Sequence, residues 1–186
     1  MKDEAIVIAV IAGTSRDERR SLQAAKYVAE MGRRLEYVEI IFVDPKDFNL
    51  PGDGNNESDR DAHYTDIVTR ADAYFIVTPE YNHSIPGSLK RMLDSEYGPY
   101  LHKQVALAGV SNGPWGGVRA CEALLPICHR LGMVNLVPEL YFPNIQDIFS
   151  ENGAIREDLR DMYEKNVRKS YDELLWFARL LKSARS

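Results

Sequence analysis

Short apolar segments alternate with amphipathic segments along most of the chain. The first, at residues 6–11, is almost wholly apolar and β-branched, which is typical of a strand buried on both faces of a parallel sheet. Similar segments predict strands at residues 6–11, 35–43, 73–77, 103–110 and 134–137. Apolar residues at helical spacing predict helices at about residues 16–32, 59–70, 85–94, 116–131 and 159–181.

Strands that alternate with helices predict an α/β fold with a doubly wound parallel sheet. Five strands in 186 residues fit the flavodoxin-like order 2-1-3-4-5, a three-layer sandwich, better than a six-stranded dinucleotide-binding sheet. The length also predicts one domain over residues 1–186. In this strand order the loops after the first, third and fourth strands converge, so we expect the ligand there.

The composition and net charge of the chain argue against nucleic acid and membranes as its binding partners. With 45% hydrophobic and 27% charged residues and a net charge of −5, the chain has a globular composition and no overall attraction for nucleic acid or anionic membranes. No apolar run approaches the roughly 20 residues of a membrane span. Cys121 and Cys128 are seven residues apart on one predicted helix, which favours reduced core thiols in a cytoplasmic protein over a disulfide.

The loop after the first strand carries hydroxyls and cations. It contains Gly13, Thr14, Ser15, Arg16, Arg19 and Ser21. Backbone N–H groups at a helix N-terminus attract an anion, and arginines there are otherwise unfavourable because of the helix dipole. A phosphate site explains this pattern, but Ser15 and Glu18 also fit a capping box that needs no ligand. On this loop alone the two interpretations are equally supported.

Two further loops follow the third and fourth strands. The loop at residues 79–82 (Pro79, Glu80, Tyr81, Asn82) is a stiff turn able to hold a flat ligand with polar edges. The loop at residues 111–119 contains Ser111, Gly113, Gly116 and Gly117, and its glycines allow a backbone to approach a ligand closely. Each loop taken alone also fits a plain strand-to-helix connection.

Together the three loops resemble the NAD(P)H-dependent FMN reductase family, which includes quinone, azo and chromate reductases. The matching motifs are Gly13-Thr14-Ser15-Arg16-x-x-Arg19 with Ser21, Pro79-Glu80-Tyr81-Asn82-x-Ser84-x-Pro86-Gly87-x-Leu89-Lys90, and Ser111-x-Gly113-x-x-Gly116-Gly117-x-Arg119. The second motif is the most specific, and the resemblance extends from the first strand to the helix after Gly117.

The resemblance implies a flavodoxin-like fold, bound FMN, NADPH or NADH as co-substrate, a small-molecule electron acceptor, and a homodimer or homotetramer. By position it implies that Thr14 or Ser15, Arg16, Arg19 and Ser21 hold the FMN phosphate. It implies that residues 79–82 line the isoalloxazine, that Ser111, Gly116 and Gly117 approach its pyrimidine side, and that Gly113 of the same motif also belongs to the cofactor site. The expected reaction passes a hydride from NAD(P)H through FMN N5 to a quinone, flavin or similar acceptor.

No catalytic side chain and no metal site are expected, because the cofactor carries the chemistry and the four histidines lack ligand spacing. The alternative from another class is an FMN-binding electron carrier or redox-sensing protein without nicotinamide turnover. The loop at residues 47–58 has no role that its sequence indicates.

Overall fold

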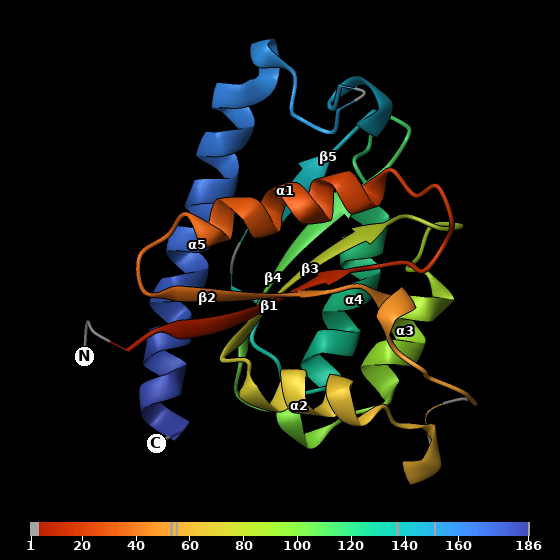
Figure 1. Ribbon diagram of the computed structural model, residues 1–186, viewed down its shortest axis with the longest axis vertical. Helices are drawn as coiled ribbons and strands as arrows, with labels where there is room; N and C mark the ends of the chain where they lie inside the picture. The colour runs from red at the N-terminus through yellow and green to blue at the C-terminus, as the bar shows by residue number, and fades with distance from the viewer. Residues whose placement is uncertain (1–3, 53, 55, 137, 151, 186) are drawn as a thin grey trace.

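A five-stranded parallel sheet forms the centre of the computed structural model (Figure 1). The structure describes residues 4–52, 54, 56–136, 138–150 and 152–185. The helices and strands are β1 (Ile6–Ala12), α1 (Ser21–Arg33), β2 (Val38–Val43), α2 (Ala62–Arg70), β3 (Ala73–Pro79), α3 (Gly87–Asp94), β4 (Gln104–Val110), α4 (Val118–Arg130), β5 (Leu140–Phe142) and α5 (Glu157–Arg185). The short 3-10 helices are η1 (Pro45–Asp47), η2 (Glu57–Asp59), η3 (Gly98–Tyr100) and η4 (Ile145–Asp147).

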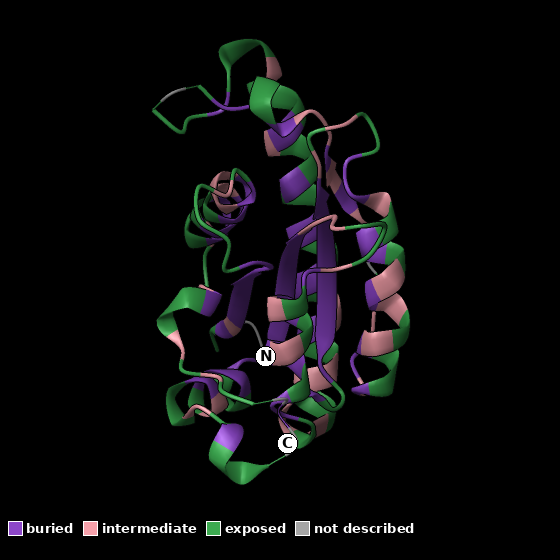
Figure 2. Cartoon of the chain, turned by 90° about the vertical axis from the view of Figure 1, so that its right-hand side faces the viewer, coloured by how far each residue is buried: buried purple, intermediate pink, exposed green. Residues whose placement is uncertain are grey.

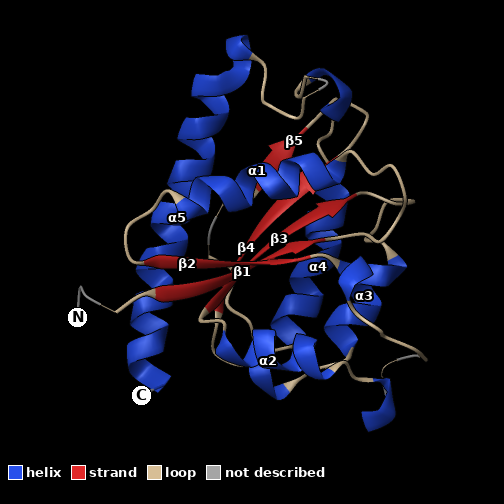
Figure 3. Cartoon of the chain, in the orientation of Figure 1, coloured by secondary structure: helices blue, strands red, loops and turns tan. Residues whose placement is uncertain are grey.

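The strand order is β2-β1-β3-β4-β5, which confirms the predicted flavodoxin-like fold. Helices α1 and α5 cover one face of the sheet, and α2, α3 and α4 cover the other (Figure 3). Each face of the sheet packs against its helices in a separate hydrophobic core, and successive side chains of β1 point to alternate cores. Ile8 and Val10 lie on the α1 side, and Ala9 and Ile11 lie on the α4 side. The central strands β1, β3 and β4 are therefore buried between two layers of helices (Figure 2), which explains why their sequences are almost continuously apolar.

The prediction of the fifth strand at residues 134–137 was wrong. Val134 makes only an isolated bridge to Gln104, Leu136 is 60% exposed, and residue 137 lies outside the described residues. The ladder resumes at Leu140, which is 5% exposed and pairs with Ala108 of β4. Pro138 lies between the two segments and has no N–H to donate, so a strand is not continuous there.

Several predicted helix boundaries also differ from the structure. The first helix begins at Ser21 and not near residue 16, and the last extends over Glu157–Arg185 and not 159–181. The third-strand segment and the helix that follows it match the prediction closely. Helix α4 continues through Pro126 to Arg130. The late start of α1 matters most, because it leaves residues 13–20 as an irregular loop.

The cysteines behave as core residues. Cys121 and Cys128 are free and fully buried, and burial raises the pKa of each thiol to about 12. At neutral pH both are therefore protonated and poor nucleophiles. Within the described ranges, no helix has both the length and the hydropathy needed to cross a bilayer.

Candidate functional site

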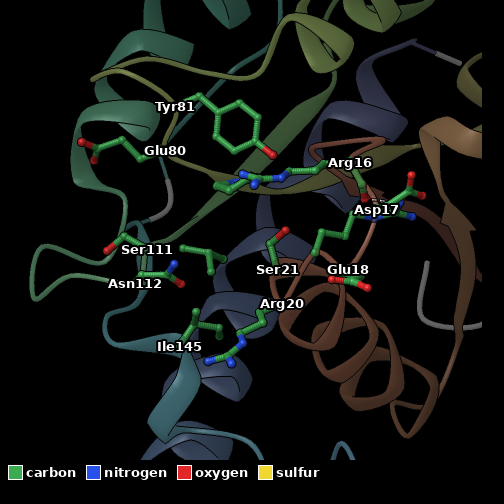
Figure 4. Close-up of a pocket in the computed structure, with 13 residues that line it drawn as sticks. Arg16, Asp17, Glu18, Arg20, Ser21, Glu80, Tyr81, Ser111, Asn112 and Ile145 are labelled. Atoms are coloured by element: carbon green, nitrogen blue, oxygen red, sulfur yellow. Dashed lines mark hydrogen bonds between the residues drawn. The ribbon is translucent and has the colours of Figure 1, made fainter.

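A cleft of about 390 Å³ opens at the carboxyl ends of β1, β3 and β4 (Figure 4). Its volume lies within the range of roughly 300–1,000 Å³ that small-molecule sites occupy. The lining residues come from the loops after β1, β3, β4 and β5. They are Arg16, Asp17, Glu18, Arg19, Arg20, Ser21, Pro79, Glu80, Tyr81, Val110, Ser111, Asn112 and Ile145.

The first loop does not form the capping box that its sequence permits. Glu18 has a left-handed φ of 51° and lies before the helix, whose N-cap is Arg20 without a side-chain cap. In the part of the chain that the structure describes, the backbone amides of residues 17–20 have no hydrogen-bond partner. The loop therefore presents free N–H donors at the positive end of the α1 dipole, which is the arrangement that binds phosphate.

Neighbouring elements hold this loop in place. Gly13 N donates to Val77 O over 2.8 Å, and a Cβ on Gly13 would lie 2.7 Å from Thr78 Cα, so only glycine fits beside β3. Thr14 is 2% exposed, and its Oγ1 lies 3.1 Å from the Tyr81 hydroxyl. The Ser15 amide donates to Ser88 Oγ over 3.3 Å. Thr14 thus connects the first loop to the second loop, Ser15 connects it to α3, and neither residue lines the cleft.

The three arginines of the first loop have different environments. Arg16 and Arg20 are exposed, line the cleft, and form no ion pair with any described residue (Figure 4). The Arg19 side chain is 6% exposed, and its guanidinium pairs with Asp44. Arg16 and Arg20 are therefore available to an anion in the cleft, whereas both Nη atoms of Arg19 bind protein oxygens and its buried Nε has no partner among the described residues.

The second loop is a tight hairpin turn. Tyr81 N donates to Ser84 O over 2.9 Å, and Ser84 N donates to Tyr81 O over 3.0 Å. Asn82 and His83 between them have φ of 49° and 63°, the positive values that two-residue hairpin turns require. Asn82 is exposed and does not line the cleft, so the turn conformation accounts for this amide residue.

The residues before the turn form one wall of the cleft. Glu80 Oε1 accepts from Arg119 Nη1 over 3.3 Å, and its Oε2 is buried without a hydrogen-bond partner in the described part of the chain. A buried carboxylate oxygen without a donor is uncommon in native proteins. Glu80 therefore offers an acceptor that an N–H group of a ligand in the cleft can satisfy.

The third loop shapes the opposite wall. Ser111 Oγ donates to Gly113 O over 2.8 Å, and the amides of Asn112 and Gly113 have no partner among the described residues. Gly116 and Gly117 have φ of 64° and 82°, and a Cβ on Gly117 would lie 2.4 Å from Val110 N. Gly117 lets the start of α4 pack against β4, Gly116 lets the loop pass close to Tyr141 of β5, and neither glycine lines the cleft.

Seven predicted site residues line the cleft and six do not. Those that line it are Arg16, Arg19, Ser21, Pro79, Glu80, Tyr81 and Ser111; those that do not are Thr14, Ser15, Asn82, Gly113, Gly116 and Gly117. The sequence analysis missed Asp17, Glu18, Arg20, Val110, Asn112 and Ile145. Arg20 is a third cation of the same loop and could have been predicted. Ile145 follows β5, and because the sequence analysis predicted that strand at residues 134–137, it did not predict that Ile145 reaches the cleft.

The chain is similar to enzymes that reduce quinones and azo compounds. It is 28% identical to a quinone reductase of Pseudomonas putida, in an alignment covering 86% of this chain and 90% of the relative. It is 33% identical to an NADPH azoreductase of Bacillus sp., covering 87% and 89% of the two chains.

A solved structure confirms the fold. The flavoenzyme NAD(P)H:(acceptor) oxidoreductase FerB from Paracoccus denitrificans superimposes with a TM-score of 0.73 at 21% identity, covering 96% of this chain and 98% of FerB. The family model described as NADPH-dependent FMN reductase matches residues 6–147, from the start of β1 to the end of η4, and so includes every loop of the cleft. The chain belongs to the NADPH-dependent FMN reductase family.

Proposed function

We propose that the protein holds FMN in this cleft and uses it to transfer electrons from NAD(P)H to a small-molecule acceptor such as a quinone. One observation carries the proposal: the first loop borders the cleft with backbone amides and two arginines that have no partner among the described residues, and the other walls are Tyr81 and the third loop. That combination matches a ligand with a phosphate at one end and a flat ring at the other.

The first loop fits the phosphate. The amides of residues 17–20, the Ser21 hydroxyl and the Arg16 guanidinium supply donors and positive charge from three kinds of group. Thr14 and Ser15, which the family resemblance assigned to the phosphate, instead support the loop through Tyr81 and Ser88.

The second and third loops fit the ring. Pro79 and Tyr81 give the ring an apolar and aromatic wall, and the buried Glu80 Oε2 supplies an acceptor. The amide of Asn112, which has no partner among the described residues, would supply a donor for negative charge that develops on the bound ring. Gly116 and Gly117 set the path of this loop, and they and Gly113 do not line the cleft.

FMN held by the first loop and residues 79–81 would supply the redox chemistry, a two-electron transfer from NAD(P)H to the acceptor. The protein contributes binding, orientation and preorganised donors, and no side-chain nucleophile is needed. Quinone and azo compounds are the acceptors that the names of the relatives indicate.

Three broader properties belong to the same proposal. We propose one FMN-binding domain over residues 1–186, and a cytoplasmic protein whose buried cysteines stay reduced. We also propose a homodimer or homotetramer, for which the exposed Tyr97, Trp115 and Trp176 provide apolar contact surface.

Steady-state turnover tests the proposed reaction against the alternative of an electron carrier. FMN-loaded protein is mixed with NADPH or NADH and a benzoquinone, and the absorbance of the reduced nicotinamide is followed. We expect sustained NAD(P)H oxidation that requires both bound FMN and the quinone, with flavin-free protein as the control. Tight FMN binding without turnover on either nicotinamide would instead identify a carrier or a redox sensor.

A further inference from the structure

We propose that Asp44, which lies outside the cleft, positions the phosphate-binding loop through Arg19 and thereby sets a preference for FMN over riboflavin. The two flavins differ only in the terminal phosphate. The inference rests on the proposed function, because it concerns the end of the cleft that would receive that phosphate.

The Arg19 guanidinium binds oxygens of the protein through both of its Nη atoms, while its Nε is buried without a hydrogen-bond partner among the described residues. Its Nη2 donates to Asp44 Oδ2, and its Nη1 donates to the backbone oxygen of Arg16 over 3.0 Å. The side chains of Arg19 and Asp44 are only 6% and 15% exposed. Removing the Asp44 charge would leave the Arg19 cation buried without a counter-ion, so the pair and its contact with the loop depend on each other.

The contact with Arg16 O fixes the direction of a peptide group. In a trans peptide the C=O and the following N–H point in opposite directions. Holding Arg16 O toward the Arg19 guanidinium therefore turns the Asp17 N–H away from it. That amide belongs to a residue of the cleft wall and has no partner within the described part of the chain. Arg19 thus fixes the direction of one of the proposed phosphate donors.

The loop needs such support because its own sequence does not favour its shape. Glu18 has a φ of 51°, a left-handed conformation that is unfavourable for a residue other than glycine. Asp44 is a rigid anchor, because its Oδ1 accepts from Lys46 N over 3.0 Å and caps η1 directly after β2. The end of β2 thereby determines the geometry of a loop that begins at the end of β1.

A second ion pair on the same loop provides a matched control. Lys46 pairs with Asp17, but both side chains are exposed, at 42% and 88%, and this pair holds no backbone carbonyl of the loop. Exposed ion pairs contribute little to structure. The Lys46→Met variant therefore removes one charge near the loop without disturbing the Arg19 contact.

The test measures dissociation constants for FMN and for riboflavin by quenching of flavin fluorescence, on the full-length chain freed of flavin. We expect wild type to prefer FMN. We expect Asp44→Asn to reduce that preference by about tenfold or more, through weaker FMN binding with unchanged riboflavin binding. Lys46→Met should keep the wild-type preference within about twofold.

Each other outcome has a defined meaning. If folded Asp44→Asn keeps the wild-type preference, or weakens both flavins equally, the proposed positioning role is wrong. If Asp44→Asn does not fold, the double variant Asp44→Asn with Arg19→Gln, which removes both buried charges, must show the same loss of preference. Wild type that binds both flavins equally also overturns the inference, and wild type that binds neither overturns the proposed function.

Discussion

Replacing Gly117 with alanine is expected to lower the free energy of unfolding by about 2–5 kcal/mol. The new Cβ would lie 2.4 Å from Val110 N, a backbone atom of β4 that cannot move aside cheaply, and the residue has a φ of 82°. Overpacking and a left-handed backbone each cost about 1–3 kcal/mol. Urea unfolding followed by circular dichroism measures the change.

Gly113→Ala is the matched control from the same loop. A Cβ on Gly113 would have no heavy atom within 4 Å, and its φ is not in the left-handed range. We expect a change within about 0.5 kcal/mol, as for an ordinary surface substitution. Equal destabilisation by the two substitutions would show that the close approach of α4 to β4 does not constrain the loop.

Replacing Arg16 with methionine is expected to weaken FMN binding by about 10- to 100-fold. Arg16 lines the cleft, has no ion-pair partner among the described residues, and belongs to the loop with free amides. A hydrogen bond to a charged group contributes about 1.5–3 kcal/mol, which corresponds to this range of affinity. Fluorescence quenching of FMN by the flavin-free protein measures the change.

Lys26→Met separates a local contact from the general loss of a positive charge. Lys26 lies on α1, is exposed and does not line the cleft. Its replacement therefore removes one positive charge, as Arg16→Met does, but away from the cleft. We expect less than a threefold change in FMN affinity from this variant, because salt screens exposed charges beyond about a Debye length. Similar losses from both variants would contradict the assignment of Arg16 to the phosphate.

The sheet could be predicted from the sequence because its strands are buried on both faces. Residues of β1 such as Ile8 and Ile11 face different cores, yet both are fully buried, so the apolar run is continuous and unambiguous. The edge strand lacks this signal. Leu136 is apolar but exposed, and the true β5 contains only residues 140–142.

The site could be located from the sequence, but the role of each residue could not. Ser15 and Glu18 satisfy the local pattern of a capping box, yet contacts from Asp44, Tyr81 and Ser88 hold the loop in another shape. Asp44 is 25 residues from Arg19 in the sequence, so no local pattern reveals their pairing. The sequence likewise does not distinguish Asn82, whose conformation makes the turn, from a residue that contacts a ligand.

The most direct test of the account is an anaerobic titration of FMN-loaded protein with NADPH and, separately, with NADH. The central claim is that the cleft holds FMN where a reduced nicotinamide can reach it. We predict that about one equivalent of at least one of the two nicotinamides removes the visible absorbance of oxidised flavin. Protein that takes up no FMN, or that keeps the full absorbance of bound flavin with excess NADPH and NADH, would contradict the account.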